Sequence, residues 1–318
     1  MNNKYLPEGI LSTTSENREY ITSLAGLERA MHEDRILEAT VMLCDSQMRL
    51  HVDLYGVEGI IERNEAVYCR GGEQIKDIAI ITRVGKPVCF KVMAIEYRDG
   101  RPIAILSRRA AQIECIKRYV CDLCCGDIIK TRVTHLENFG AFVDIGCGIS
   151  SLLSVDSISV SRISHPSDRL SVGSYVYTVI KSIDEESGRI FVSMRELLGT
   201  WEENASMFEA GQTVAGIVRS IEDYGVFVEL APNLAGLAEI RDGGCNKPAV
   251  NIGQYAAVYI KSIIPERMKI KLVIIDSYKG ELPSCELKYF VDVKKTSHID
   301  HWRYSPEVST KKIETVFE

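Results

Sequence analysis

Two pairs of aromatic residues stand at matching places in the sequence, about 85 residues apart. The segment "NFGAFVDI" contains Phe139 and Phe142, and the segment "DYGVFVEL" contains Tyr224 and Phe227. In each pair a glycine follows the first ring, and the second ring lies in a run typical of a strand. Flat rings on an open strand face can stack on planar ligands such as unpaired nucleic-acid bases, at roughly 1–3 kcal/mol per base.

Neighbouring carboxylates predict the face on which these rings lie. Successive side chains of a strand point to opposite faces, so Phe142 lies beside Asp144, and Phe227 lies beside Glu229. Burial of an unpaired carboxylate is costly, so we expect this face to be solvated and both rings to be exposed. The alternative is that the rings complete a core or pack under a loop, as isolated aromatic residues usually do. The same placement in two copies favours a functional surface.

The aromatic pairs belong to a longer internal repeat. The stretch from Gly126 aligns without a gap with the stretch from Gly211, and "VGSYVYTVIKSID" from Val172 aligns with "IGQYAAVYIKSII" from Ile252. A fainter copy precedes them, where "VGKPVCFKVMAIEYRDGRPIAILS" from Val84 has the same rhythm. The chain therefore contains three related units, and a repeat of this kind decides the architecture of a fold.

Each unit reads as about five short strands with period-two alternation, separated by glycines and polar loops. Such units are typical of small, closed or partly closed β-barrels. We predict an all-β protein of three tandem five-stranded barrels, joined by helical connectors at 108–120 and 196–208. The predicted domains are an N-terminal segment, three barrels and a tail: 1–32, 33–110, 121–197, 209–276 and 277–318.

The two ends of the chain carry weaker patterns. Apolar residues recur at helical spacing in the N-terminal segment: Tyr20, Leu24, Leu27 and Met31. A capping box from Thr13 to Glu16 is expected to start this amphipathic helix. In the tail, segments 281–295 and 305–317 are candidate extensions of the last sheet.

The second copy carries a long motif of a known type. It reads "GDIIKTRVTHLENFGAFVDIG" from Gly126 and "LSVGSYVYTVIKSIDEESGRIFVSMRE" from Leu170. This motif resembles the S1 RNA-binding domain family, whose members are OB-fold barrels. The resemblance covers the second copy and most of the third, and the first copy resembles a degenerate member. Three such modules joined by helical connectors resemble short bacterial members of the ribosomal protein S1 family.

The resemblance implies which residues contact RNA in the second copy. The family combines two aromatic residues, a histidine, an aspartate and an arginine on one face. Their positions are occupied here by Phe139, Phe142, Ser154, Asp184 and Arg189. The serine can hydrogen-bond but not stack, whereas the arginine can stack on a base or bind phosphate. We expect the aspartate to orient the arginine or to cap the turn.

The other two copies depart further from the family pattern. The third copy keeps three of the groups: Tyr224, Phe227 and Lys269. Glu239 replaces the histidine there, so we expect weaker RNA binding than in the second copy. In the first copy Met48 and His51 replace the aromatic pair. We therefore expect the first barrel to dock on protein, with the small ribosomal subunit as the candidate partner.

Composition limits the classes of function. The 318 residues are 46% hydrophobic and 26% charged, as in ordinary folded proteins. A net charge of −6 argues against a general polyanion binder, because non-specific nucleic-acid affinity comes from lysine and arginine. No apolar run reaches the roughly 18–20 residues of a membrane span, and the N-terminus lacks a signal-peptide pattern. We expect a cytoplasmic protein with no membrane association.

Cysteine and catalytic motifs give no strong signal. The ten cysteines are expected to be reduced. Cys121, Cys124 and Cys125, with Cys115 nearby, are the candidate metal or redox group, but a single C-x-x-C lacks the second pair of a structural zinc site. The sequence has no phosphate-binding glycine loop, nucleophile elbow or H-E-x-x-H motif. We predict no catalysis, no cofactor and no bound metal.

Three functional hypotheses follow. In the first, a non-catalytic protein holds single-stranded mRNA by stacking and local basic contacts, in translation at the small ribosomal subunit. In the second, the same barrels serve an RNA-turnover or regulatory accessory factor. In the third, segment 121–125 is the centre of a thiol- or zinc-dependent sensor, which stoichiometric zinc in the purified protein would favour.

Overall fold

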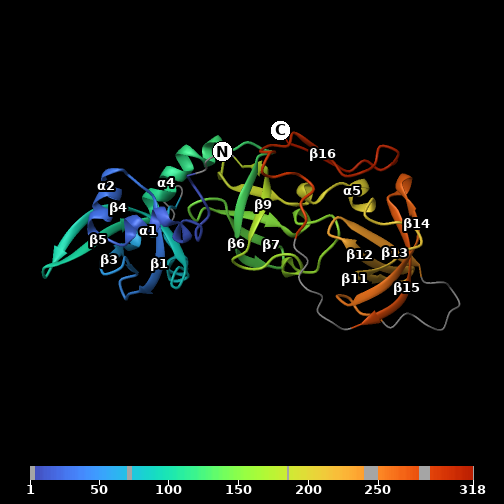
Figure 1. The fold of residues 1–318 in the computed structure, drawn as a ribbon, viewed down its shortest axis with the longest axis horizontal. Coiled ribbons are helices and arrows are strands. Elements are labelled where there is room, and N and C mark those ends of the chain that lie inside the picture. The colour runs from blue at the N-terminus through green and yellow to red at the C-terminus, as the bar shows by residue number, and fades with distance from the viewer. Residues whose placement is uncertain (1–3, 70–73, 185, 240–249, 279–286, 318) are drawn as a thin grey trace. The chain divides into compact units, whose positions relative to one another are not determined.

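Three closed β-barrels form the architecture of the protein, seen in a computed structural model that describes residues 4–69, 74–184, 186–239, 250–278 and 287–317 (Figure 1). The first barrel contains β1 (Leu37–Cys44), β2 (Leu50–Asp53), β3 (Glu58–Ile61), β4 (Pro87–Arg98) and β5 (Arg101–Ser107). The second contains β6 (Ile128–Glu137), β7 (Gly140–Asp144), β8 (Ser150–Ser154), β9 (Tyr175–Ile183) and β10 (Ile190–Ser193). The third contains β11 (Thr213–Glu222), β12 (Gly225–Ala231), β13 (Leu234–Glu239), β14 (Tyr255–Ile264) and β15 (Lys269–Tyr278).

The three barrels share one connectivity. In each of them the strands follow the circular order first, second, third, fifth, fourth and back to the first. The third and fifth strands pair in parallel in every barrel. A five-stranded barrel of this kind is an OB-fold, so the predicted fold class is confirmed.

Small aliphatic side chains at alternate strand positions fill the barrel cores. Matching valines of the first two strands are 0–2% exposed: Val41 and Val52, Val133 and Val143, Val218 and Val228. Directly after Val41 and Val218 the pairing register shifts by a bulge. The bulge places Leu43 opposite His51 and Ser220 opposite Phe227, on the outer face. The alternation therefore separates a fully buried inner face from an outer face with half-buried and exposed side chains.

Helical connectors lie where the sequence predicts them. α4 (Arg108–Arg118) follows the first barrel and is capped by Ser107, whose Oγ accepts from the Ala110 amide at 2.8 Å. Between the second and third barrels lie a short 3-10 helix and α5 (Trp201–Ala205), which begins with a reciprocal capping box. Trp201 is buried in the core of the third barrel, so this connector is part of that core. A further helix, α3 (Asp77–Ile81), precedes β4.

The N-terminal segment forms two helices rather than one. α1 (Ser15–Ile21) is capped by Thr14, which accepts from the Asn17 amide at 3.2 Å, so the predicted cap at Thr13 is wrong. α2 (Leu24–His32) has a cap of its own at Ser23. The extended backbone of Ser23 interrupts the helical pattern, because its hydroxyl accepts from the Gly26 amide instead. None of the helices in the described ranges is long and apolar enough to cross a membrane.

In its described part, the C-terminal tail does not extend the third barrel. β16 (His301–Arg303) and β17 (Glu314–Val316) pair only with each other, so the expectation of an extended last sheet is wrong for residues 287–317. Residues 281–286 of that expectation lie outside the described residues. Trp302 and Tyr304 of the tail pack into the core cluster of the third barrel. Burial of these two rings explains why the tail folds along the barrel instead of adding a strand.

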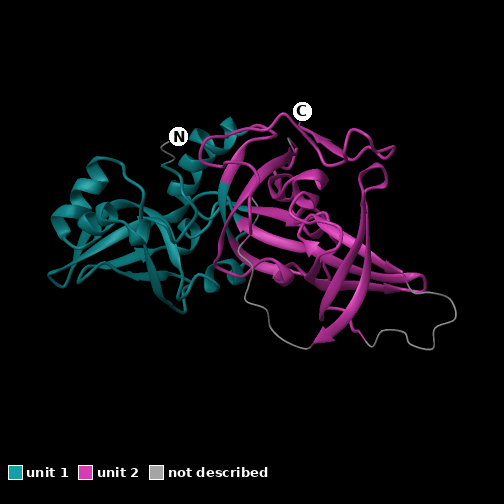
Figure 2. Ribbon diagram, turned by 45° about the vertical axis from the view of Figure 1, so that its right-hand side comes forward, with its two compact units in different colours: residues 1–123, 130–132, 144–150 teal, residues 124–129, 133–143, 151–318 magenta. Residues whose placement is uncertain are grey.

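Contacts divide the chain into two compact units (Figure 2). Residues 1–123, 130–132 and 144–150 form the first unit, and residues 124–129, 133–143 and 151–318 form the second. The three-domain division with the predicted boundaries stays a prediction. Residues 240–249 of the third predicted domain lie outside the described residues.

A buried cluster of charges lies within the second unit. Glu229 of β12 is 5% exposed and lies between the guanidinium groups of Arg169 and Arg219. Arg219 Nε lies 2.7 Å from Glu229 Oε2, and its Nη1 lies 3.0 Å from Asp168 Oδ2. Because the loop at 168–169 follows the third strand of the second barrel, the cluster ties this loop to β12 of the third barrel.

Glu229→Ala is expected to destabilise the third barrel by about 3–5 kcal/mol, because it leaves two buried guanidinium groups without their shared counter-charge. Both tryptophans, Trp201 and Trp302, lie in this core, so urea unfolding followed by tryptophan fluorescence reports on it. The control Asp292→Ala removes an exposed ion pair with Lys295 and should change the stability by less than about 0.5 kcal/mol. Equal unfolding midpoints for the two variants would contradict a structural role for the cluster.

Candidate nucleic-acid interface

The two aromatic pairs have the same geometry in both barrels. Ring centroids of Phe139 and Phe142 are 6.0 Å apart at an interplanar angle of 89°, and those of Tyr224 and Phe227 are 6.1 Å apart at 90°. The first rings, Phe139 and Tyr224, are 55% and 59% exposed. The second rings, Phe142 and Phe227, are half-buried on the outer barrel face. Each pair therefore presents one projecting ring and one ring that lies against the barrel.

A close approach of two strands positions the first ring. A Cβ atom on Gly140 would lie 2.5 Å from the Leu153 carbonyl oxygen, and one on Gly225 would lie 2.7 Å from the Ala238 carbonyl oxygen. Only glycine fits between the second and third strands at these points. Each glycine is the first residue of its strand, and the preceding ring lies in the turn that joins the first and second strands, where it is exposed.

The expectation that Asp144 and Glu229 lie on a solvated face is wrong, because both carboxylates are buried. Asp144 accepts hydrogen bonds from the backbone amides of Glu8, Gly146 and Gly148 at 2.7, 2.8 and 3.0 Å. Burial and the nearby Glu8 carboxylate raise the pKa of Asp144 to about 8, although the amide donors act in the opposite direction. Glu229 is neutralised by its two arginines. Because the two carboxylates are buried, the accessible part of this face is at the start of each strand, where the rings lie.

The outer face of the third barrel shows which residues lie in line with the second ring. Across four strands the register joins Ser220, Phe227, Leu237 and Lys271. We call the equivalent set in the second barrel the outer row: His135, Phe142, Leu152 and Phe191. The His135 ring stacks over Phe142 at 6.4 Å and 24°, and Phe191 pairs with Leu152.

The predicted site contains neither His135 nor Phe191. Phe191 lies between buried Ile190 and Val192, so period-two alternation predicts that it points outward. His135 lies two positions after buried Val133, so strict alternation would place it on the inner face. In the third barrel the register shifts between the matching residues Val218 and Ser220, and alternation alone does not reveal such a shift.

Ser154 lies at the end of β8 beside the first ring. The amide of the next residue, Val155, donates to the carbonyl oxygen of Phe139 at 2.9 Å. The Ser154 hydroxyl donates to Ser157 Oγ at 2.9 Å, and Lys181 Nζ also donates to Ser157 Oγ at 2.9 Å. Lys181, which the sequence interpretation missed, therefore brings a positive charge to the serine position.

The β9–β10 hairpin carries Asp184 and Arg189. Asp184 accepts from the Glu186 amide at 3.1 Å and from the amide and hydroxyl of Ser187 at 3.2 and 2.5 Å. The Ser187 hydroxyl and amide lower the pKa of Asp184, which thus caps the turn, one of its two expected roles. Arg189 is exposed, and the parallel register with β8 places it level with Ser150. The hairpin groups and Ser154 therefore lie at opposite ends of β8, on either side of the outer row.

In the third barrel, the corresponding polar positions carry a different charge pattern. Glu239 is exposed and lies 3.3 Å from Lys271 Nζ. This ion pair partly neutralises the positive charge that Lys271 could offer to a phosphate. Lys269 is exposed and pairs with Ile264 across β14 and β15. Lys269 and Arg189 each lie level with the end of the third strand that is farther from the first ring.

The first barrel has an imidazole in place of the second ring. His51 Nδ1 lies 2.7 Å from Glu58 Oε1, and Nε2 lies 3.1 Å from Asp45 Oδ2. Met48 stands in place of the first ring and packs against the barrel core. Two carboxylates beside the imidazole make this face unfavourable for a polyanion.

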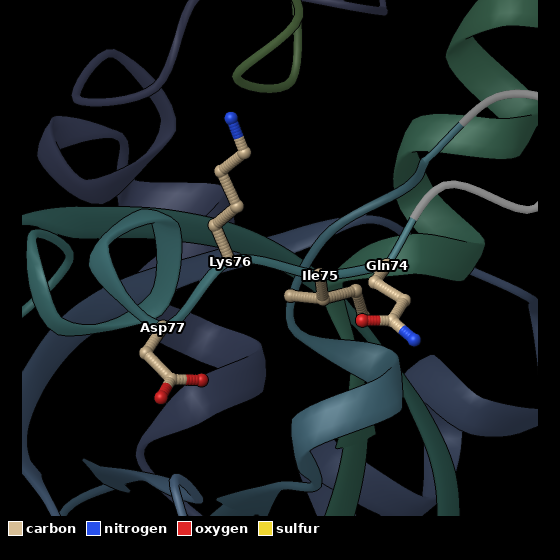
Figure 3. A pocket seen from close by; sticks show the side chains of 4 residues that line it. All are labelled: Gln74, Ile75, Lys76 and Asp77. Atoms are coloured by element: carbon tan, nitrogen blue, oxygen red, sulfur yellow. The ribbon is translucent and has the colours of Figure 1, made fainter.

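A surface pocket of the first barrel lies next to α3 and is lined by four consecutive residues, 74–77 (Figure 3). Lys76 extends away from Asp77, and Asp77 is paired with Arg63 at 2.6 Å. The lining contains no aromatic side chain, so the pocket offers no surface for base stacking.

Cysteines of the candidate metal group lie in different environments. Cys115 is buried in a core cluster with Cys89 and Cys147, whereas Cys121 and Cys124 are exposed. Within the described ranges, no group of three or more His, Cys, Asp or Glu residues is arranged to hold a metal ion.

These features define a class of protein: tandem OB-fold barrels with an aromatic pair on either side of the glycine that begins the second strand. Residues 125–195 match the family described as "S1 RNA binding domain". The second barrel is therefore a member of the S1 RNA-binding domain family, as its motif indicates.

The chain is also similar to curated proteins named small ribosomal subunit protein bS1. The chain is 34% identical to that of Leuconostoc lactis over 156 residues, which cover 48% of this chain and 36% of the relative. It is 32% identical to that of Staphylococcus haemolyticus over 237 residues, 71% of this chain and 58% of the relative. It is 27% identical to that of Rhodopseudomonas palustris over 284 residues, 87% of this chain and 47% of the relative. The chain thus spans between about a third and three fifths of these relatives.

Gly225→Ala is expected to destabilise the third barrel by about 1–3 kcal/mol, because its methyl group meets backbone atoms of β13. Urea unfolding followed by tryptophan fluorescence measures the change. Asp223→Ala, an exposed change in the same turn, is the matched control and should stay within about 0.5 kcal/mol of the parent. A variant as stable as this control would show that the close approach does not require glycine.

Proposed function

We propose that this chain is a non-catalytic RNA-binding protein that holds single-stranded mRNA in translation at the small ribosomal subunit. One observation carries the proposal: the same perpendicular ring pair, with one ring projecting, occurs in two barrels. The S1 match at residues 125–195 and the bS1 relatives support it. Cytoplasmic localisation follows from the same proposal.

Stacking supplies most of the affinity in this proposal. Phe139 projects from the surface and offers its faces to a base, and Phe142 supports it from the side. Stacking is tolerant of base identity, so the site accepts many sequences. Lys181 and Arg189 give local phosphate contacts on either side of the outer row, while Ser154 offers a hydrogen bond. With a net charge of −6, the chain makes few phosphate contacts, and its affinity depends weakly on salt.

The second barrel is the stronger site. At the position beside the first ring it has neutral Ser154 with Lys181 close by, whereas the third barrel has Glu239 there. A carboxylate near a phosphate path repels the strand, and Glu239 also occupies Lys271. Tyr224, Phe227 and Lys269 therefore form an auxiliary site.

The first barrel serves for docking on protein. Its imidazole lies between two carboxylates, and exposed apolar side chains lie on its strands and loops. Four of these are 54–64% exposed: Met42, Tyr55, Met93 and Tyr97. Exposed aromatic and methionine side chains are enriched where proteins bind one another. The bS1 relatives suggest the small ribosomal subunit as the partner.

RNA binding is tested by fluorescence anisotropy with a labelled, unstructured RNA of about 12 nucleotides at two salt concentrations. Phe139→Ala/Phe142→Ala is expected to weaken binding at least about ten-fold, because it removes a stacking ring and its support. Tyr224→Ala/Phe227→Ala should have a smaller effect. Equal affinity of all three proteins, or no binding by the parent chain, would refute the stacking site.

Docking is tested by co-sedimentation of the chain with purified small ribosomal subunits. The parent chain is expected in the pellet, and Tyr55→Asp/Tyr97→Asp should shift it to the supernatant while its RNA affinity stays unchanged. A parent chain that remains in the supernatant would contradict the ribosomal role and would leave the RNA-binding proposal unaffected.

A further inference from the structure

His135 lies on the outer face of β6, at the position that matches Ser220 of the third barrel, which pairs with Phe227. Its side chain is 62% exposed, and its ring stacks on Phe142 at 6.4 Å and 24°. Nε2 lies 2.7 Å from Glu137 Oε1, a contact that fixes the rotation of the ring. One face of His135 covers Phe142, which leaves the opposite face toward solvent.

Phe191 lies at the other end of the outer row. It pairs with Leu152 of β8 on one side and with Ser182 of β9 on the other. It is half-buried, and β10 is two strands from β7, so Phe191 stands about 10 Å from Phe142 across the sheet. The row thus has rings at both ends, with Phe142 and Leu152 between them.

These two rings are not needed for the barrel core. Their strand neighbours Val133 and Val192 point inward and are 0% and 1% exposed. Together with Val143 of β7 they fill the interior on the opposite face. The rings on the outer face therefore add apolar surface that does not contribute to the barrel core.

The other barrels have no ring at either end of this row. In the third barrel the end positions are Ser220 and Lys271. In the first barrel they are Leu43 and Ile105. The flanking rings are particular to the barrel that matches the S1 family.

We propose that His135 and Phe191 are base-stacking residues, which extend the Phe139–Phe142 pair into a track across β6, β7, β8 and β10 for consecutive bases of one unpaired RNA strand. This inference rests on the proposed RNA-binding function and deepens it. Bases stack on the solvent face of His135 and on the exposed part of Phe191, while Phe139 holds a base beside the row. The distance across the sheet from β6 to β10 is then long enough for more than one nucleotide.

The test compares His135→Ala and Phe191→Leu with the parent chain by anisotropy, with a labelled oligouridylate of about 12 nucleotides. Each variant is expected to lose at least about five-fold in affinity, the lower end of the effect of one stacking ring. Leucine keeps the apolar volume at 191, and the unfolding midpoint of each variant is measured alongside. The control His301→Ala removes another surface histidine paired to a glutamate, at 3.1 Å from Glu314, and should bind as the parent does.

A gain-of-function variant tests the same idea without loss of packing. Ser220→His, made in the Phe139→Ala/Phe142→Ala background, places an imidazole opposite Phe227 and should tighten binding about five-fold. The inference is overturned if His135→Ala and Phe191→Leu both bind within about two-fold of the parent while Phe139→Ala/Phe142→Ala loses affinity. If the parent chain itself does not bind the oligouridylate, the proposed function fails, and this inference fails with it.

Discussion

The candidate site depends on one steric constraint, the contact between the second and third strands at Gly140 and Gly225. Carbonyl oxygens of the neighbouring strand lie where a Cβ atom would stand. This contact packs the first residue of the second strand against the third strand, directly after the turn that joins the first and second strands. The turn presents Phe139 and Tyr224 to solvent, and the following ring is half-buried on the outer barrel face. Strand packing and ring presentation thus meet at the same backbone contact.

Charge has a secondary part in this arrangement. The buried carboxylates Asp144 and Glu229 lie at one end of their strands, where amides and arginines satisfy them. Because these charges are neutralised inside the protein, they do not repel a ligand at the rings. Beside the first ring the second barrel has Ser154, and the third barrel has Glu239. The carboxylate of Glu239 therefore adds a repulsion of phosphate that the second barrel lacks, in addition to the differences at the two ends of the outer row.

Local sequence patterns were sufficient for the barrels and the ring pairs. Strand alternation and the internal repeat predict three small five-stranded barrels, and the resemblance to the S1 family implies that they are OB-folds. The burial of Asp144 was not predictable in this way, because its first donor is the Glu8 amide, 136 residues away in the chain. Arg169 and Glu229 are likewise 60 residues apart. The helix caps at Thr14 and Ser23 were not predicted for another reason. Several neighbouring hydroxyl residues can act as helix caps, and the sequence does not show which of them does so. His135 and Phe191 do not occupy positions of the family's RNA-binding motif, so the resemblance does not point to them.

The right angle between the rings has a consequence for the ligand. In free RNA, neighbouring bases lie parallel and stabilise each other by stacking. The His135 ring lies within 24° of the Phe142 plane, and the Phe142 plane meets that of Phe139 at 89°. A base on Phe139 and a base on the solvent face of His135 are therefore steeply inclined to each other. A strand that occupies both rings must therefore give up one of its own stacking steps. Purines stack on each other more strongly than pyrimidines, so the selectivity of such a surface is set by what the nucleic acid loses as well as by what the protein offers.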